Sequence, residues 1–147
     1  MKRIAKIFSV SSVALVMAGC LLTGCGAGKP QTMTLSLDSN PTTGYSWTVT
    51  QDPELFTVTE EFVEGENSEG FVGVGGQQVF TLTPDNAGTS AVTFTYSRPW
   101  EDPEQEITVI AYTVDVSSSK QIQVTSAKME AGDDAGDLPE VPSPVIK

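Results

Sequence analysis

Apolar and polar residues alternate with a period of two along several segments of the chain from residue 33 onward. Such alternation is typical of β-strands that bury one face and expose the other. The segments that show it are residues 33–37, 45–50, 56–58, 79–83, 91–96, 107–116 and 121–125. No amphipathic helical pattern of useful length follows residue 24. We therefore predict an all-β fold, an antiparallel β-sandwich.

The large apolar residues on these segments indicate the core of one domain over residues 32–127. Trp47 is expected to anchor this core. Its expected packing partners are Phe80, Phe94 and Tyr112. Residues 60–70, a segment rich in glutamate, are expected to form an exposed loop. Residues 128–147 hold three prolines and few large apolar groups, so we predict a flexible acidic tail there.

The first 24 residues have a different pattern from the rest of the chain. A basic start with Lys2, Arg3 and Lys6 is followed by an apolar stretch that reaches about residue 22. This stretch is too short to span a membrane comfortably and is typical of a secretory signal. It ends in Leu-Thr-Gly-Cys at residues 22–25, which resembles the bacterial lipobox; residues 17–20 are a weaker second candidate.

If residues 22–25 are a lipobox, Cys25 is the lipidated first residue of the mature protein. Residues 1–24 are then a lipoprotein signal peptide, and residues 25–31 a tether that reaches roughly 20–25 Å when extended. We expect an exported protein, lipid-anchored to a bacterial membrane at the cell surface or the periplasmic face. The alternative is an ordinary secretory signal with two incidental cysteines.

Charge limits the partners of the mature chain. Three of the eight basic residues precede residue 25, while all 19 acidic residues follow it, which leaves a net charge of −14. Such acidity argues against binding nucleic acid or anionic lipid electrostatically. We expect a monomer that meets the membrane through its lipid alone.

Composition also excludes several kinds of chemistry. The chain has no histidine, and its two cysteines, Cys20 and Cys25, lie at the signal segment. Cys–His and Ser–His–Asp catalysis and zinc sites built from Cys or His are excluded. We predict no enzyme activity, no cofactor and no metal. Carboxylates at residues 101–106 leave glycoside hydrolysis as an alternative to a solvated acidic loop. A calcium site in the same cluster or in residues 60–69 is a further alternative.

Three neutral or glycine-rich loops stand out between the predicted strands. Loop 1 (residues 40–45, Asn-Pro-Thr-Thr-Gly-Tyr) combines local hydrogen-bonding side chains, a proline and a glycine, so it is expected to be rigid. Loop 2 (residues 73–76, Gly-Val-Gly-Gly) allows close backbone approach to a partner. Loop 3 (residues 98–100, Arg-Pro-Trp) holds two residue types enriched in interface hot spots. Alternate loops of an antiparallel sandwich fall at the same end, so the three are expected to cluster.

In this order and spacing the three motifs resemble those of the chagasin family of cysteine-peptidase inhibitors. The resemblance covers roughly residues 33–116 and implies an immunoglobulin-like sandwich that inhibits papain-like cysteine peptidases competitively, with a three-loop wedge in the active-site cleft. The residues it implies for peptidase binding are Asn40, Pro41, Thr42, Thr43, Gly44, Tyr45, Gly73, Val74, Gly75, Gly76, Arg98, Pro99 and Trp100.

The chain departs from the family at its start, and one alternative function remains. The family usually begins with a further strand, which is absent or very short here, and we expect residues 121–125 to cover the sheet edge that it leaves bare. The short tether implies that the loops point away from the membrane. The alternative function is a surface module that binds carbohydrate or protein through exposed Tyr45 and Trp100.

Overall fold

The computed structural model describes residues 28–65, 75–100, 108–130 and 140–147. Within these ranges the chain forms strands and one short turn of 3₁₀ helix, η1 (Pro41–Thr43). The strands are β1 (Met33–Ser39), β2 (Ser46–Asp52), β3 (Phe56–Glu64), β4 (Gly76–Pro84), β5 (Gly88–Ser97), β6 (Thr108–Val116), β7 (Ile122–Glu130) and β8 (Val145–Ile146). The predicted all-β class is therefore confirmed.

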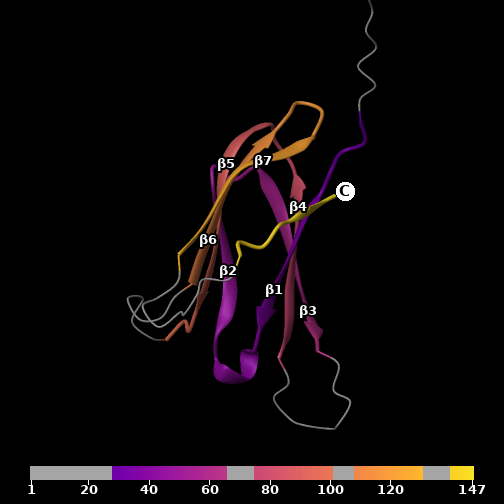
Figure 1. The fold of residues 1–147 in the computed structure, drawn as a ribbon. Helices are drawn as coiled ribbons and strands as arrows, with labels where there is room; N and C mark the ends of the chain where they lie inside the picture. The colour runs from indigo at the N-terminus through magenta and orange to yellow at the C-terminus, as the bar shows by residue number, and fades with distance from the viewer. Residues whose placement is uncertain (1–27, 66–74, 101–107, 131–139) are drawn as a thin grey trace, which may run out of the picture.

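The strands form two four-stranded antiparallel sheets, with the orders β3-β4-β1-β8 and β2-β5-β6-β7. The sheets lie face to face, as Figure 1 shows, and this confirms the immunoglobulin-like β-sandwich. The consecutive strands β1 and β2 belong to different sheets. Loop 1 is therefore a crossing from one layer of the sandwich to the other.

The core lies between the sheets and follows the alternation of the sequence. In β1, Met33, Leu35 and Leu37 point inward and are almost fully buried. Three aromatic rings fill the centre as two edge-to-face pairs, with Phe80–Phe94 centroids 5.2 Å apart and Phe94–Tyr112 centroids 6.0 Å apart. Trp47 is buried as predicted, but its aromatic neighbour is Tyr96, at 4.9 Å.

Several strands are longer than the alternation predicted. The acidic run from Glu60 to Glu64, expected in a loop, continues β3 and pairs with β4 as far as Gly76. Residues 122–125 are only the first part of β7, which pairs with β6 to Glu130, and Gln121 precedes the strand. Side chains along β3 and β7 are largely exposed. Edge strands of this kind lack the buried face that makes period-two alternation visible.

The prediction of a flexible tail over residues 128–147 is corrected in its described parts. Residues 128–130 belong to β7, and β8 pairs with the start of β1, with Ile146 opposite Met33. Thr32 and Lys147 exchange two backbone hydrogen bonds, of 2.9 and 3.0 Å. The buried Tyr112 hydroxyl donates to the carbonyl of Pro142 at 2.6 Å. The final segment is thus held on the sandwich, while residues 131–139 lie outside the described residues.

These pairings also change which segment covers which edge. β7, which includes residues 122–125, lies beside β6 at the edge of its own sheet. The edge of β1 is paired instead with β8, at Met33 and Thr34. The expectation that residues 121–125 cover the edge left bare by the missing strand is therefore corrected, because β8 pairs with the edge of β1 and β7 lies at an edge of the other sheet.

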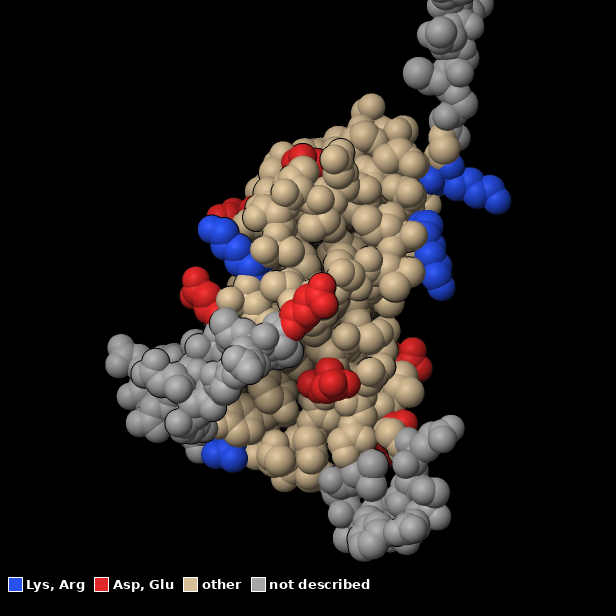
Figure 2. All heavy atoms as spheres, viewed as in Figure 1, with Lys and Arg blue, Asp and Glu red and all other residues tan. Residues whose placement is uncertain are grey.

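The two ends of the sandwich differ in what they carry. The start of the described chain lies beside the β6–β7 turn, where Gln31 donates its backbone N–H to the Lys120 carbonyl at 2.9 Å. The coil of η1 lies at the opposite end, at the bottom of Figure 1. In the described residues, no helix is long and apolar enough to cross a membrane. Acidic and basic side chains are scattered over the face in Figure 2, without a continuous basic patch in its described part.

Candidate functional site

Loop 1 is held in shape by its own hydrogen bonds. The Asn40 side-chain oxygen accepts from the backbone N–H of Thr42 at 3.3 Å and from its hydroxyl at 2.5 Å. The Asn40 carbonyl accepts from the Thr43 N–H at 3.0 Å and from its hydroxyl at 2.6 Å. Pro41 presets the backbone of the first helical position, and Gly44 ends η1 in the left-handed region, with φ of 84°. The expected rigid turn therefore has a specific hydrogen-bonded form.

Loop 3 packs directly on loop 1. A Cβ placed on Gly44 would lie 2.6 Å from two carbons of the Trp100 ring, so the ring rests against the bare glycine backbone. The Arg98 Nε donates to the Thr43 carbonyl at 3.0 Å. Its guanidinium also lies over the Tyr45 ring, 4.3 Å from the centroid, a cation–π distance. Trp100 nevertheless stays 71% exposed, which leaves most of the ring available to a partner.

Loop 2 approaches loop 1 from the other side. A Cβ on Gly75 would lie 3.3 Å from the Ser39 carbonyl and 3.6 Å from the Asn40 Cβ. A Cβ on Gly76 would collide with the carbonyl of Val63, so the hairpin of β3 and β4 requires glycine there. Gly73 and Val74 lie outside the described residues. For the described part of loop 2, the predicted clustering at one end holds.

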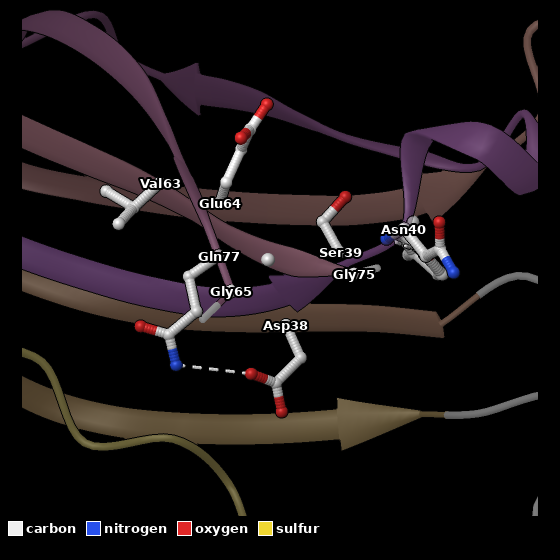
Figure 3. Close-up of a pocket in the computed structure, with 10 residues that line it drawn as sticks. Asp38, Ser39, Asn40, Val63, Glu64, Gly65, Gly75 and Gln77 are labelled. Atoms are coloured by element: carbon white, nitrogen blue, oxygen red, sulfur yellow. Dashed lines mark hydrogen bonds between the residues drawn. The ribbon is translucent and has the colours of Figure 1, made fainter. Parts of the chain in front are cut away.

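A groove opens beside the place where this hairpin meets loop 1, and Asn40 and Gly75 both line it. Its volume is about 590 Å³, and it is formed by the loop-side ends of β1, β3 and β4 together with Tyr96. In Figure 3 the Glu64 side chain stands on one side of the strands, while Asp38 and Gln77 form a hydrogen bond of 3.2 Å on the other. Loop 1 thus borders a concave surface on the side of the hairpin.

Two residues that support loop 1 were not predicted. Tyr96, the partner of Trp47 across β2 and β5, stacks on Tyr45 with centroids 5.2 Å apart, and its hydroxyl accepts from the Asn40 N–H at 3.4 Å. Gln78 is buried between the sheets beside Trp47. The sequence pattern could have identified Gln78, because it is the polar residue among the alternate inward-facing positions of β4 that continue with Phe80 and Leu82.

The arrangement suits binding rather than bond cleavage. The exposed groups on loop 1 are hydroxyls, a proline ring and backbone, and loop 3 adds an indole and a guanidinium. In the described residues, no group of three or more His, Cys, Asp or Glu side chains could hold a metal ion. The carboxylates at residues 101–106, weighed above as an acidic cluster, lie outside the described residues.

A β-sandwich that gathers three loops at one end is the architecture of a protein that binds through those loops. A family model for the chagasin family peptidase inhibitor I42 matches residues 27–114, so the chain belongs to the chagasin family. This confirms the resemblance inferred from the three motifs. The family consists of peptidase inhibitors, which confirms the prediction that the chain is not an enzyme.

Two relatives found by sequence agree with this assignment, and one solved structure is similar over part of the chain. Amoebiasin-2 of Entamoeba histolytica is 30% identical over 81 residues, which cover 54% of this chain and 66% of that protein. Chagasin of Trypanosoma cruzi is 35% identical over 78 residues, which cover 49% of this chain and 69% of chagasin. The crystal structure of the cysteine protease inhibitor EhICP2 from Entamoeba histolytica is 29% identical, with a TM-score of 0.44, over 48% of this chain and 65% of that one. The chain therefore spans about two thirds of the length of these relatives.

Proposed function

We propose that this protein inhibits papain-like cysteine peptidases competitively, by inserting loops 1, 2 and 3 into the active-site cleft as one wedge. The observation that carries the proposal is the convergence of the loops. Trp100 and Arg98 pack on loop 1 from one side, and Gly75 approaches it from the other. The described parts of three motifs that are far apart in the sequence thereby lie together at one end of the sandwich.

Each loop has a distinct role in this proposal. Thr42 and Thr43 of loop 1 would lie beside the catalytic thiolate and imidazolium of the peptidase, where hydroxyls hydrogen-bond the charged pair without offering a bond to cleave. Loop 2 would run along the unprimed side and pair through its backbone. Arg98 and Trp100 would cover the primed side, with the exposed indole packing on an aromatic surface.

The shape of loop 1 favours tight binding. Ordering a mobile loop on association costs affinity, and a loop already held by internal hydrogen bonds avoids most of that cost. Five such bonds join residues 40–44 to one another, a sixth joins Tyr45 to Thr43, and Gly44 is braced by Trp100. We expect the complex to bury roughly 1,600 Å², the standard size for inhibitor complexes.

Titration of papain tests this function. We expect the apparent KM for a small substrate to rise with inhibitor concentration while kcat stays constant, because substrate and wedge compete for one cleft. Several papain-like enzymes should be compared, since the target is unknown. No inhibition of any of them at micromolar concentration would contradict the proposal and favour a surface module that binds carbohydrate or protein.

We also propose that Cys25 is lipidated and that the loops face away from the membrane. The supporting observation is the position of the first described residues, where Gln121 donates to the Lys29 carbonyl at 2.9 Å, at the end of the sandwich away from η1. A membrane-impermeant thiol reagent should label a Trp100→Cys variant in membranes prepared with the anchored face outward. Full protection of that cysteine, with Thr57→Cys at the other end labelled, would contradict this orientation.

A further inference from the structure

Gln78 is a polar residue in an apolar place. It lies on the inward face of β4 and is only 4% exposed. A buried amide is unfavourable unless its donors and acceptors find partners, so its hydrogen bonds indicate what it does.

All four hydrogen-bonding positions of the Gln78 amide are used. Its oxygen accepts from the Ser39 hydroxyl at 2.8 Å and from the backbone N–H of Trp47 at 2.9 Å. Its nitrogen donates to the Trp47 carbonyl at 3.1 Å and to a Glu60 carboxylate oxygen at 2.8 Å. One side chain thus joins four strands, β1, β2, β3 and β4, across the two sheets.

The two bonds to Trp47 take the place of ladder hydrogen bonds on the unpaired edge of β2. β2 is at the edge of its sheet and pairs only with β5 in the described residues. An edge strand leaves alternate backbone N–H and C=O groups without a ladder partner. The Gln78 amide supplies one donor and one acceptor to Trp47, as a neighbouring strand would.

These bonds join both stems of loop 1. Ser39 is the last residue of β1, directly before Asn40, and Trp47 follows Tyr45 by two positions. Because β1 and β2 lie in different sheets, no ladder holds the stems together. The bond of 2.9 Å from the Trp47 indole N–H to the Asp38 carbonyl is a further link between the two stems.

We infer that Gln78 is a positioning residue that fixes the spacing of the loop 1 stems and thereby sets the affinity of the inhibitor. The inference rests on the proposed function, because affinity is defined only against a peptidase. Without the amide, loop 1 would sample wider stem separations in the free protein, and binding would have to order it.

A matched control exists at the other end of the sandwich. Gln51, on β2, also uses its amide to hold backbone: it donates to the Phe56 carbonyl at 2.7 Å and accepts from the N–H groups of Leu55 and Phe56 at 3.1 and 3.0 Å. Methionine has a similar length and removes these bonds. Gln78→Met and Gln51→Met should therefore both lower the melting temperature, but only the first should loosen loop 1.

The test measures the inhibition constant for papain and amide hydrogen exchange for the wild type and both variants. We expect Gln78→Met to raise the inhibition constant roughly tenfold and to speed exchange at Thr43 and Gly44, whose N–H groups bond within loop 1. Gln51→Met should leave both quantities at wild-type values. Ser39→Ala removes one of the four bonds, so it should raise the inhibition constant and speed exchange by smaller amounts. This variant takes the place of Gln78→Met in the test if Gln78→Met does not fold.

Equal inhibition constants for the wild type and Gln78→Met, or equal shifts in the two methionine variants, would overturn the inference and leave the proposed function standing. If the wild type inhibits no peptidase, the proposed function fails. Exchange then decides on the positioning role alone: acceleration in Gln78→Met but not in Gln51→Met supports it, and equal exchange rejects it.

Discussion

At the scale of single residues, a few side chains decide whether three loops act as one surface. Gly44 meets two requirements at once, a φ of 84° and a backbone bare enough for Trp100 to lie against it. The loop motifs were recognisable from residue type, because proline, glycine and asparagine have distinct backbone preferences. The contribution of Tyr96 was not, since a tyrosine at the end of a strand has the same period-two position whether it packs on the core or on a loop.

Tyr112 illustrates how a buried polar atom makes stability depend on pH. Burial raises the pKa of its hydroxyl to about 12, from 10.0. Below pH 10 the hydroxyl is protonated in both folded and unfolded chains. As the pH rises from 10 toward 12, the unfolded chain loses this proton first, so the free energy of unfolding should fall by about 2 kcal/mol.

A Tyr112→Phe variant isolates this effect. It lacks the bond to the Pro142 carbonyl, so it should be less stable than the wild type at neutral pH by about 1 kcal/mol. The deficit should shrink or reverse between pH 10 and 12, as measured by denaturant unfolding. Parallel stability profiles for the two proteins over this range would contradict the assignment.

At the scale of elements, the buried strands were predictable and the edges were not. β1, β4, β5 and β6 bury alternate residues, so period-two alternation marks them clearly. β3 and β7 carry runs of exposed residues and were predicted too short. β8 has only two residues, Val145 and Ile146, and no local pattern reveals so short a strand. Its pairing with β1 depends on a contact across more than a hundred residues.

At the scale of the whole molecule, the sandwich separates two tasks. One end receives the chain from the proposed tether, and the opposite end presents loop 1 with Gly75 and Trp100 beside it. The assignment of this end from sequence depended on topology: three loops that connect the strands in alternation must fall on the same side of an antiparallel sandwich. Contacts between loops, such as that of Arg98 with Thr43, required the folded structure.

The most direct test of the central claim is the inhibition constant for papain of Thr42→Ala, Gly75→Ala and Trp100→Ala. A matched control is Thr57→Ala, which removes a hydroxyl bonded to Asp85 at 2.7 Å on the start of β3. We predict a higher inhibition constant for each loop variant, with the largest rise, roughly thirtyfold, for Trp100→Ala, and no change for the control. If all three loop variants inhibit papain as well as the wild type does, the converging loops are not the inhibitory surface.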